Sequence, residues 1–128
     1  MLNGKVLADH RILVVEDDPL IAMVLADILR DCGAEVAGPA AKLEEATRLA
    51  TMNGLSAALL DIRLNGVEVW PAAQILADKE VPFIFCSGHF DSHSLPSQWR
   101  SRPILSKPVS AKQVVAAMVD LIGRRPPA

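Results

Sequence analysis

Short, continuously apolar runs separated by longer amphipathic stretches constrain the fold of this chain most strongly. "RILVVE" (residues 11–16), "SAALLDI" (56–62), "PFIFCSG" (82–88) and the shorter "RPILSKP" (102–108) have the pattern of buried strands, because their apolar residues continue rather than alternate. "AEVAG" (34–38) is a weaker strand candidate. Strands that alternate with helical patterns predict a parallel α/β sheet.

Helical patterns fill the intervals between these strands. The first helix should bury one apolar face, formed by Leu20, Ile21, Val24, Leu25, Ile28 and Leu29. Gly33 should end this helix as a left-handed cap. Further helices are expected over 42–52, from about Pro71 to Asp78, and from Ser110, with Gln113 completing a capping box, to Gly123. Residues 90–102 stand where another helix belongs, but a proline and several serines predict a short or irregular one.

The composition indicates one folded domain, since 51% of the 128 residues are hydrophobic and 22% are charged. We expect this domain to span residues 10–124, with flexible ends at 1–9 and 125–128. The net charge of −2 and the scattered basic residues argue against a nucleic-acid-binding surface. No apolar run is long enough to cross a membrane, and the N-terminus lacks a signal segment. With Cys32 and Cys86 interpreted as core residues in a reducing compartment, these features predict a cytoplasmic protein.

Reactive side chains stand at the ends of the predicted strands. Glu16 and Asp17 end the first strand, Asp61 the third, Ser87 the fourth and Lys107 the fifth. In an open parallel sheet, the carboxyl ends of the strands form the edge at which ligands bind. The sequence therefore predicts that three acids, a hydroxyl and an ammonium meet at one edge.

These residue types suit a phosphoryl group and a magnesium ion. Carboxylates are hard oxygen ligands of the kind that Mg²⁺ prefers. Lys107 offers a positive charge and Ser87 a hydrogen-bond donor to phosphate oxygens. Asp61 is the best candidate for a nucleophile that forms an aspartyl-phosphate, because it stands alone on a central strand.

Plainer interpretations exist for several of these residues. Asp18 precedes Pro19 at a helix start, so we interpret it as an N-cap rather than a metal ligand. Ser87 could cap a following helix, and Lys107 could be a surface lysine. The Arg63 side chain could face solvent or control access of water to an acyl phosphate.

The motifs "VVEDD" (14–18), "LLDIRLNG" (59–66), "FCSG" (85–88) and "LSKP" (105–108), in this order, resemble the CheY-like receiver domain of two-component response regulators. The resemblance covers about residues 11–123. It implies a flavodoxin-like (βα)5 three-layer sandwich with a five-stranded parallel sheet of strand order 2-1-3-4-5.

The resemblance also implies roles for the residues at the strand ends. Asp61 would accept a phosphoryl group from a phosphohistidine, Ser87 would bind the phosphate, and Lys107 would pair with it. The Lys107–Pro108 peptide would be cis. A Mg²⁺ site would be formed by Glu16, Asp17, Asp61 and the backbone carbonyl of Arg63.

Two positions depart from the usual receiver pattern. Ile104 occupies the position of an aromatic switch residue, three positions before the lysine. "PFIFCSGH" resembles the PFxFATGY motif of an alphaproteobacterial subgroup that also lacks the aromatic switch, and His89 stands where that subgroup has tyrosine. We therefore hypothesise that the activation signal leaves by a route other than the common Ser/Thr–Tyr coupling, with Ser87, His89 and Ile104 as the candidate switch residues.

The leading functional prediction is a stand-alone receiver of a two-component system or phosphorelay that signals by altered protein–protein binding. Its partners would be a sensor histidine kinase, a histidine phosphotransfer protein or a downstream regulator, with no nucleic acid and no membrane. It would not be an enzyme beyond its own phosphotransfer and autodephosphorylation. Two alternatives stay open: a Mg²⁺-dependent phosphohydrolase, which usually has an acid where this chain has Arg63, and a receiver-like interaction module that is never phosphorylated.

Overall fold

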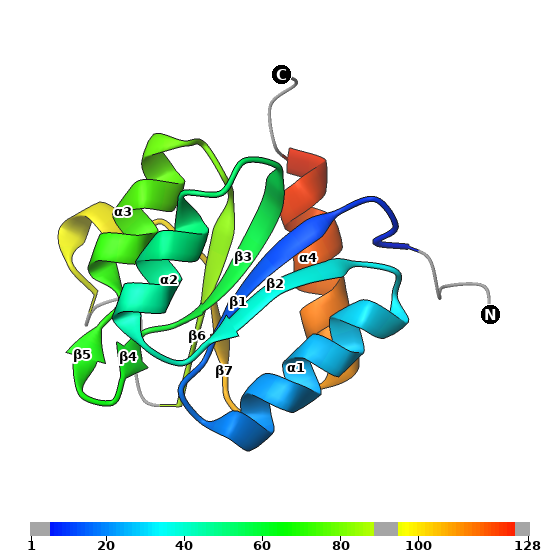
Figure 1. Ribbon diagram of the computed structural model, residues 1–128, viewed down its shortest axis with the longest axis horizontal. Coiled ribbons are helices and arrows are strands. Elements are labelled where there is room, and N and C mark those ends of the chain that lie inside the picture. The colour runs from blue at the N-terminus through cyan, green and yellow to red at the C-terminus, as the bar shows by residue number, and fades with distance from the viewer. Residues whose placement is uncertain (1–5, 89–94, 125–128) are drawn as a thin grey trace.

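The computed structural model describes residues 6–88 and 95–124, which form a three-layer α/β sandwich (Figure 1). Five parallel strands form the central sheet: β1 (Arg11–Val15), β2 (Glu35–Ala40), β3 (Leu55–Asp61), β6 (Phe83–Ser87) and β7 (Ile104–Ser106). Their order in the sheet is β2-β1-β3-β6-β7. Counted along the chain, this is the order 2-1-3-4-5, so the predicted fold class and strand order are confirmed.

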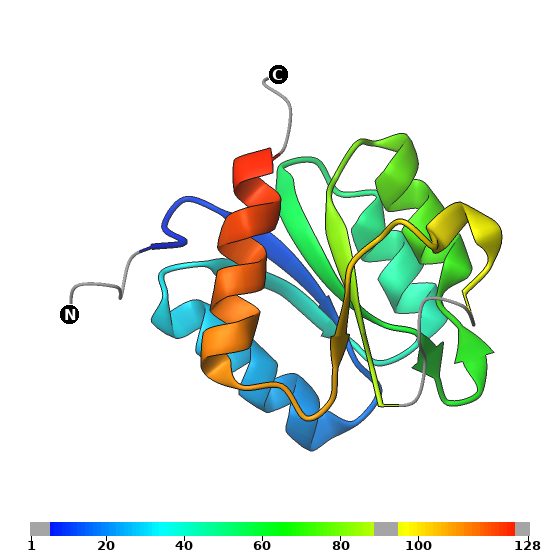
Figure 2. The ribbon, with the colours of Figure 1, turned by 180° about the vertical axis from the view of Figure 1, so that it is seen from behind.

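Helices cover both faces of this sheet (Figures 1 and 2). The four α-helices among the described residues are α1 (Pro19–Asp31), α2 (Leu43–Ala50), α3 (Trp70–Asp78) and α4 (Ala111–Arg124). One core cluster joins the sheet to α2 and α3, and a second joins it to α1 and α4. None of the helices in 6–88 and 95–124 is long and apolar enough to cross a membrane.

Two predicted helix caps are confirmed. The Asp18 carboxylate accepts hydrogen bonds from the backbone N–H groups of Leu20 and Ile21, which satisfies free donors at the start of α1. Ser110 and Gln113 exchange side-chain-to-backbone hydrogen bonds at the start of α4 and form the expected capping box.

Two details of the helix predictions are wrong. Leu20 and Val24 are 65% and 46% exposed, because α1 packs on the sheet through Leu25 and Leu29 of the predicted face together with Ala22 and Ala26. The last helix does not end at Gly123 but continues to Arg124. Gly123 is not among the glycines with positive φ, so it does not act as a left-handed cap.

The connection between β6 and β7 contains a 3₁₀ turn, η2 (Ser97–Trp99), where the sequence predicted a short or irregular helix. Trp99 is buried and packs edge-on against Phe83 and Phe85, and Trp70 packs against Phe85 in the same way. Both tryptophans therefore pack in the core cluster of α2 and α3. Cys86 is buried, Cys32 is partly buried, and both are free thiols.

The start of the domain and its edge near β2 have features that the sequence did not indicate. Leu7 is buried in the core cluster of α1 and α4, although the predicted domain boundary was residue 10. Gly38 has a φ of +93°, and a Cβ atom there would lie 2.7 Å from the Ala40 nitrogen and 2.8 Å from the Val14 oxygen. Only glycine fits this position.

Candidate functional site

The reactive residues predicted at the strand ends lie at one edge of the sheet, the lower edge in Figure 1. Glu16 and Asp17 follow β1, Asp61 is the last residue of β3, Ser87 is the last of β6, and Lys107 follows β7. All five strands run in parallel, so their carboxyl ends meet at this edge.

Three carboxylates form the centre of the site. Glu16, Asp17 and Asp61 each offer one oxygen, and these oxygens all lie within 4.8 Å of one another. Two unit charges 4.8 Å apart repel by roughly 3–4 kcal/mol at an effective dielectric constant near 20. The arrangement therefore needs positive charge or hydrogen-bond donors to hold it together.

Lys107 supplies positive charge to this cluster. Its Nζ lies 2.7 Å from Glu16 Oε1 and 3.4 Å from Asp61 Oδ2. Its backbone N–H donates to the carbonyl oxygen of Ser87 at 3.0 Å, which joins it to the end of β6. The Lys107–Pro108 peptide is cis, as the family resemblance implied.

Glu16 is held on both of its carboxylate oxygens. Oε1 forms the ion pair with Lys107, and Oε2 accepts a hydrogen bond from the backbone N–H of Asp18 at 3.0 Å. Its own N–H donates to the carbonyl of Ala40 at 2.9 Å. The residue is 2% exposed, and these partners explain how a carboxylate is tolerated there.

Asp17 is the more exposed member of the cluster, and a distant segment holds it. Its Oδ2 accepts the backbone N–H of Asn65 at 2.9 Å. Burial alone would raise the pKa of Asp17, but the hydrogen bond from the Asn65 N–H opposes burial, and the pKa of this carboxyl is lowered overall.

Asp61 is buried among like charges. Burial and the charge of Glu16 raise the pKa of its carboxyl to about 7, while Lys107 acts in the opposite direction. Burial alone would lower the pKa of Lys107, but the hydrogen bond to Glu16 and the charges of Asp61 and Glu16 raise it. The lysine is therefore an ammonium at neutral pH.

The other predicted site residues are Ser87, Arg63, Ile104 and His89. Ser87 is 8% exposed, and it stands one residue beyond Cys86, which pairs with Asp61 in the register of β3 and β6. Arg63 is exposed and begins β4 (Arg63–Leu64). Ile104 is partly buried at the start of β7, and His89 lies outside the described residues. The switch roles of Ser87, His89 and Ile104 stay predictions.

Sequence reasoning missed Asn65 as a contact of the site. Asn65 and Gly66 form the tip of a small hairpin between β4 and β5 (Val67–Glu68). An Asn-Gly pair between short strands is a strong hairpin signal. The contact between this hairpin and Asp17 depends on tertiary structure, because 48 positions separate the two residues.

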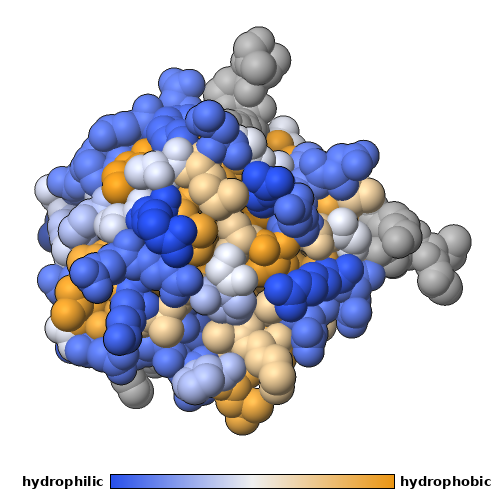
Figure 3. Space-filling view, in the orientation of Figure 1, coloured by the Kyte–Doolittle hydropathy of each residue, from blue (hydrophilic) through white to orange (hydrophobic). Residues whose placement is uncertain are grey.

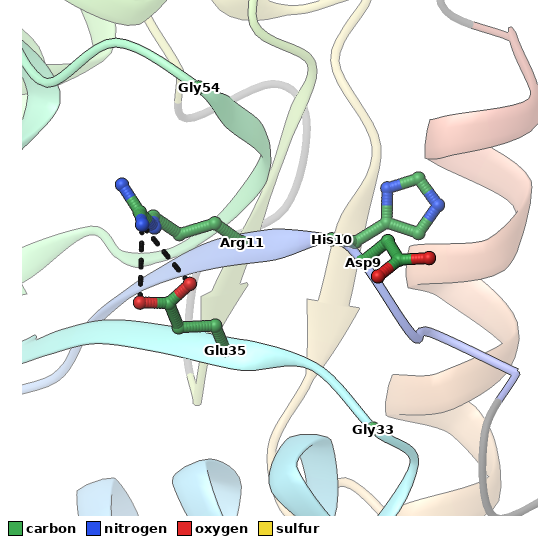
Figure 4. Close-up of a pocket in the computed structure, with 6 residues that line it drawn as sticks. All are labelled: Asp9, His10, Arg11, Gly33, Glu35 and Gly54. Atoms are coloured by element: carbon green, nitrogen blue, oxygen red, sulfur yellow. Dashed lines mark hydrogen bonds and ion pairs between the residues drawn. The ribbon is translucent and has the colours of Figure 1, made fainter.

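Two hollows lie at opposite ends of the sheet. One, of about 380 Å³, lies beside the acidic cluster between α1 and the end of β2, and it is lined by Glu16, Asp17, Met23, Arg30 and Pro39 among others. The other, of about 390 Å³, lies at the amino ends of the strands (Figure 4). There Arg11 donates to both carboxylate oxygens of Glu35 at 3.1 and 3.2 Å, so the two charges satisfy each other.

A family model for the response regulator receiver domain matches residues 12–119. Among curated proteins, the chain is similar to the transcriptional regulatory protein PdtaR of Mycobacterium tuberculosis, with 29% identity over 90% of this chain. The match covers 58% of PdtaR, so this chain spans little more than half the length of that relative.

The solved structures that are similar to this chain in both fold and sequence include the following two. SdrG from Sphingomonas melonis Fr1 is 36% identical, with a TM-score of 0.75 over 88% of this chain and 95% of that one. The receiver domain of sensor histidine kinase PA1611 from Pseudomonas aeruginosa is 25% identical, with a TM-score of 0.78 over 91% of this chain and 99% of that one. The second structure has a magnesium ion coordinated in its active site cleft.

Proposed function

Because the chain belongs to the family of response regulator receiver domains, we propose that it receives a phosphoryl group on Asp61 from a phosphohistidine in a two-component system. The observation that carries this proposal is the position of the Asp61 carboxylate between the acidic cluster and the Lys107 ammonium, 3.4 Å away. A buried carboxylate that faces a lysine and two further acids suits nucleophilic attack on phosphorus.

In the proposed step, a carboxylate oxygen of Asp61 attacks the phosphorus atom of the phosphohistidine. A P–O bond forms and the P–N bond breaks, and its electron pair remains on the imidazole nitrogen, which takes up a proton. Lys107 lies where it can interact with the arriving phosphoryl oxygens, because its Nζ already contacts Asp61 Oδ2. Hydrolysis of the acyl phosphate by water returns the carboxylate and releases inorganic phosphate.

The donor set fits a magnesium ion. Glu16, Asp17 and Asp61 present carboxylate oxygens close enough to share one small cation, and the backbone carbonyl of Arg63 would complete the protein ligands. When bound, Mg²⁺ would neutralise charge on the transferring phosphoryl group. The magnesium in the similar PA1611 receiver supports the same assignment for this chain.

Ser87 would donate its hydroxyl to a phosphate oxygen after transfer. It ends β6 and pairs in register with Ser106 of β7, so a change at Ser87 acts on both strands. The phosphoryl group adds negative charge that can bias a two-state region. The proposed output is therefore altered binding of a downstream protein by the surface around β6 and β7.

The proposed phosphodonor is a sensor histidine kinase or a histidine phosphotransfer protein. Leu20, Met23 and Val24 expose apolar side chains on α1, which begins beside the acidic cluster. Figure 3 shows hydrophobic surface at the bottom of the molecule, over the start of α1. A protein that presents a phosphohistidine to Asp61 would contact this surface, whereas a small phosphodonor would not.

We propose that the domain catalyses only its own phosphorylation and dephosphorylation. The residue two positions after Asp61 is the exposed Arg63, which cannot donate a proton as a general acid at neutral pH. This arrangement supports a receiver that is modified once per cycle over a hydrolase that turns over external phosphate esters.

Phosphorylation by phosphoramidate tests the proposal, because its P–N bond resembles that of phosphohistidine and no kinase is needed. With Mg²⁺ present, intact-mass spectrometry should show one phosphoryl group on the wild type and none on Asp61→Asn. Asp27→Asn makes the same charge change at an exposed position of α1 and should be labelled normally. Labelling of Asp61→Asn at the wild-type level would refute the assignment.

A further inference from the structure

A backbone hydrogen bond joins the β4–β5 hairpin to the acidic cluster, from the N–H of Asn65 to Oδ2 of Asp17 at 2.9 Å. We propose that the Asn65–Gly66 turn is a positioning element, which fixes the Asp17 carboxylate in the orientation that binds the divalent cation. This inference rests on the Mg²⁺-dependent function proposed above. It adds to that function the two turn residues, which supply no ligand themselves and follow the proposed carbonyl ligand Arg63 in the same hairpin.

Asp17 needs such support more than the other two acids do. Glu16 is buried and is held by Lys107 and by the Asp18 N–H, and Asp61 is fixed at the end of a central strand beside Lys107. Asp17 is partly exposed and follows the last residue of β1 by two positions. Repulsion from its two neighbours would turn its side chain towards solvent, where it could no longer share a cation with them.

The hydrogen bond from Asn65 opposes this repulsion in two ways. A donor on Oδ2 stabilises the charged form of the carboxylate and contributes to the lowered pKa of Asp17. It also fixes the rotation of the carboxylate, and so the direction of its second oxygen, Oδ1. A ligand that is oriented before the cation arrives loses less conformational freedom on binding.

The hairpin holds this donor in place. Arg63 pairs with Glu68 and Leu64 with Val67 in an antiparallel register, so the turn contains only Asn65 and Gly66. These two residues have φ angles of +51° and +87°, which suit a tight turn of the primed type.

The hairpin itself is anchored to the body of the domain. Leu64 is 2% exposed and belongs to the core cluster of α2 and α3. Val69 donates its N–H to the Ile62 carbonyl at 2.8 Å and closes the base of the hairpin. On β5, Glu68 accepts the indole N–H of Trp70 at 3.1 Å. The backbone N–H that donates to Asp17 therefore belongs to a turn whose position is fixed by packing and hydrogen bonds.

The inference is tested by straining the backbone of this turn with a substitution at Gly66 and comparing the effect with the same substitution at Gly54, outside the turn. Gly66 and Gly54 have φ angles of +87° and +86°, and a Cβ atom at either would meet nothing within 4 Å. Valine at either position strains the backbone alike, since β-branched residues strongly disfavour positive φ. Only Gly66 belongs to the turn that holds Asp17, whereas Gly54 lies at the opposite end of β3, beside the hollow shown in Figure 4.

Magnesium affinity is measured by amide chemical shifts in NMR titrations of the full chain. Gly66→Val should weaken Mg²⁺ binding about 3- to 10-fold, while Gly54→Val stays within twofold of the wild type. Asn65→Gly keeps the N–H and accepts the positive φ, so its affinity should also stay within twofold. Wild-type affinity in Gly66→Val would overturn the inference and leave the proposed function intact, because labelling of Asp61 tests that function separately. A wild type that binds no Mg²⁺ would overturn both.

A second measurement needs no metal. Replacing Asp17 with alanine removes the acceptor, so the Asn65 amide proton should exchange with solvent several-fold faster than in the wild type. Asp27→Ala, at an exposed position of α1, should leave this exchange rate unchanged. Equal exchange rates in the wild type and Asp17→Ala would show that the hydrogen bond does not hold the turn and Asp17 together. This comparison decides the question even where Gly66→Val fails to fold.

Discussion

Replacing Asp61 with asparagine should stabilise the metal-free protein at pH 8. Burial and the negative charge of Glu16 raise the pKa of the Asp61 carboxyl from 3.8 to about 7. A carboxyl group with a raised pKa binds its proton more tightly in the folded state, so stability falls as pH rises between the two pKa values. The cost is absent below about pH 4 and complete above about pH 7.

The size of this cost follows from the shift. The difference between 3.8 and about 7 is about 3 pH units, and each unit corresponds to about 1.4 kcal/mol. The resulting upper bound is about 4 kcal/mol, which screening by solvent at the open edge of the site reduces to about 1–2 kcal/mol. Lys107 keeps its 2.7 Å ion pair with Glu16, so the substitution does not leave the ammonium without a partner.

Urea unfolding followed by circular dichroism, in buffers with a chelator at pH 5 and pH 8, measures the effect. At pH 8 the free energy of unfolding of Asp61→Asn should exceed that of the wild type by about 1–2 kcal/mol, and at pH 5 by about a third of this gain. The exposed Asp27→Asn should show no such difference. An Asp61→Asn variant no more stable than the wild type at pH 8, or an equal gain at both pH values, would refute the reasoning.

Three further changes have expected outcomes. Millimolar Mg²⁺ should raise the melting temperature of the wild type in differential scanning fluorimetry, because the ion binds only the folded cluster. The melting temperature of Asp17→Asn should rise by less, because this variant has lost one of the three carboxylates. Gly38→Ala should lower the free energy of unfolding, measured with urea, by at least about 2 kcal/mol, since its Cβ would lie 2.7 Å from the Ala40 nitrogen. Gly54→Ala should lower it by about 1 kcal/mol, because the φ of +86° is strained for alanine but the space around the position is open. Met23→Glu should slow phosphotransfer from a histidine kinase about tenfold and leave labelling by phosphoramidate unchanged, because Met23 is 55% exposed on α1; equal slowing with both donors would contradict a role in protein docking.

The parts of the fold that depend on local pattern could be predicted from the sequence. Continuous apolar runs define strands buried on both faces, and parallel strands bring their carboxyl ends to one edge. For this reason the meeting of Glu16, Asp17, Asp61 and Lys107 was predictable without coordinates. The caps at Asp18 and Ser110 were also predictable, because a cap involves residues within one turn of each other in the sequence.

The buried face of α1 could be identified only in part from hydrophobicity. Leu25 and Leu29 of the predicted face are buried, whereas Leu20 and Val24 lie at the surface. Ala22 and Ala26 face the sheet instead. Which stripe is buried depends on how closely the helix approaches the sheet and on the space left by α4, and neither quantity can be read from the sequence of α1.

The partners of the charged groups also depend on tertiary geometry. The sequence predicts that Lys107 lies near Asp61, but not that its shorter contact is with Glu16, 2.7 Å against 3.4 Å. It predicts a turn at Asn65 but not the hydrogen bond to Asp17. Spacing along the chain sets which residues share an edge, whereas the distances within that edge follow from side-chain packing.

The net charge of the site indicates how phosphorylation could act without an aromatic residue at position 104. With all groups ionised, three carboxylates and the Lys107 ammonium leave a net charge of −2, which one divalent cation balances. A phosphoryl group on Asp61 carries a charge of about −1.5 to −2 in place of the single negative charge of the carboxylate. The site then contains more negative charge than before and attracts cations more strongly. In the proposed phosphorylated state, Lys107 would pair with the phosphoryl oxygens rather than with Glu16. Its backbone N–H donates to the Ser87 carbonyl at 3.0 Å, so the residue that would meet the phosphoryl group already links the ends of β6 and β7.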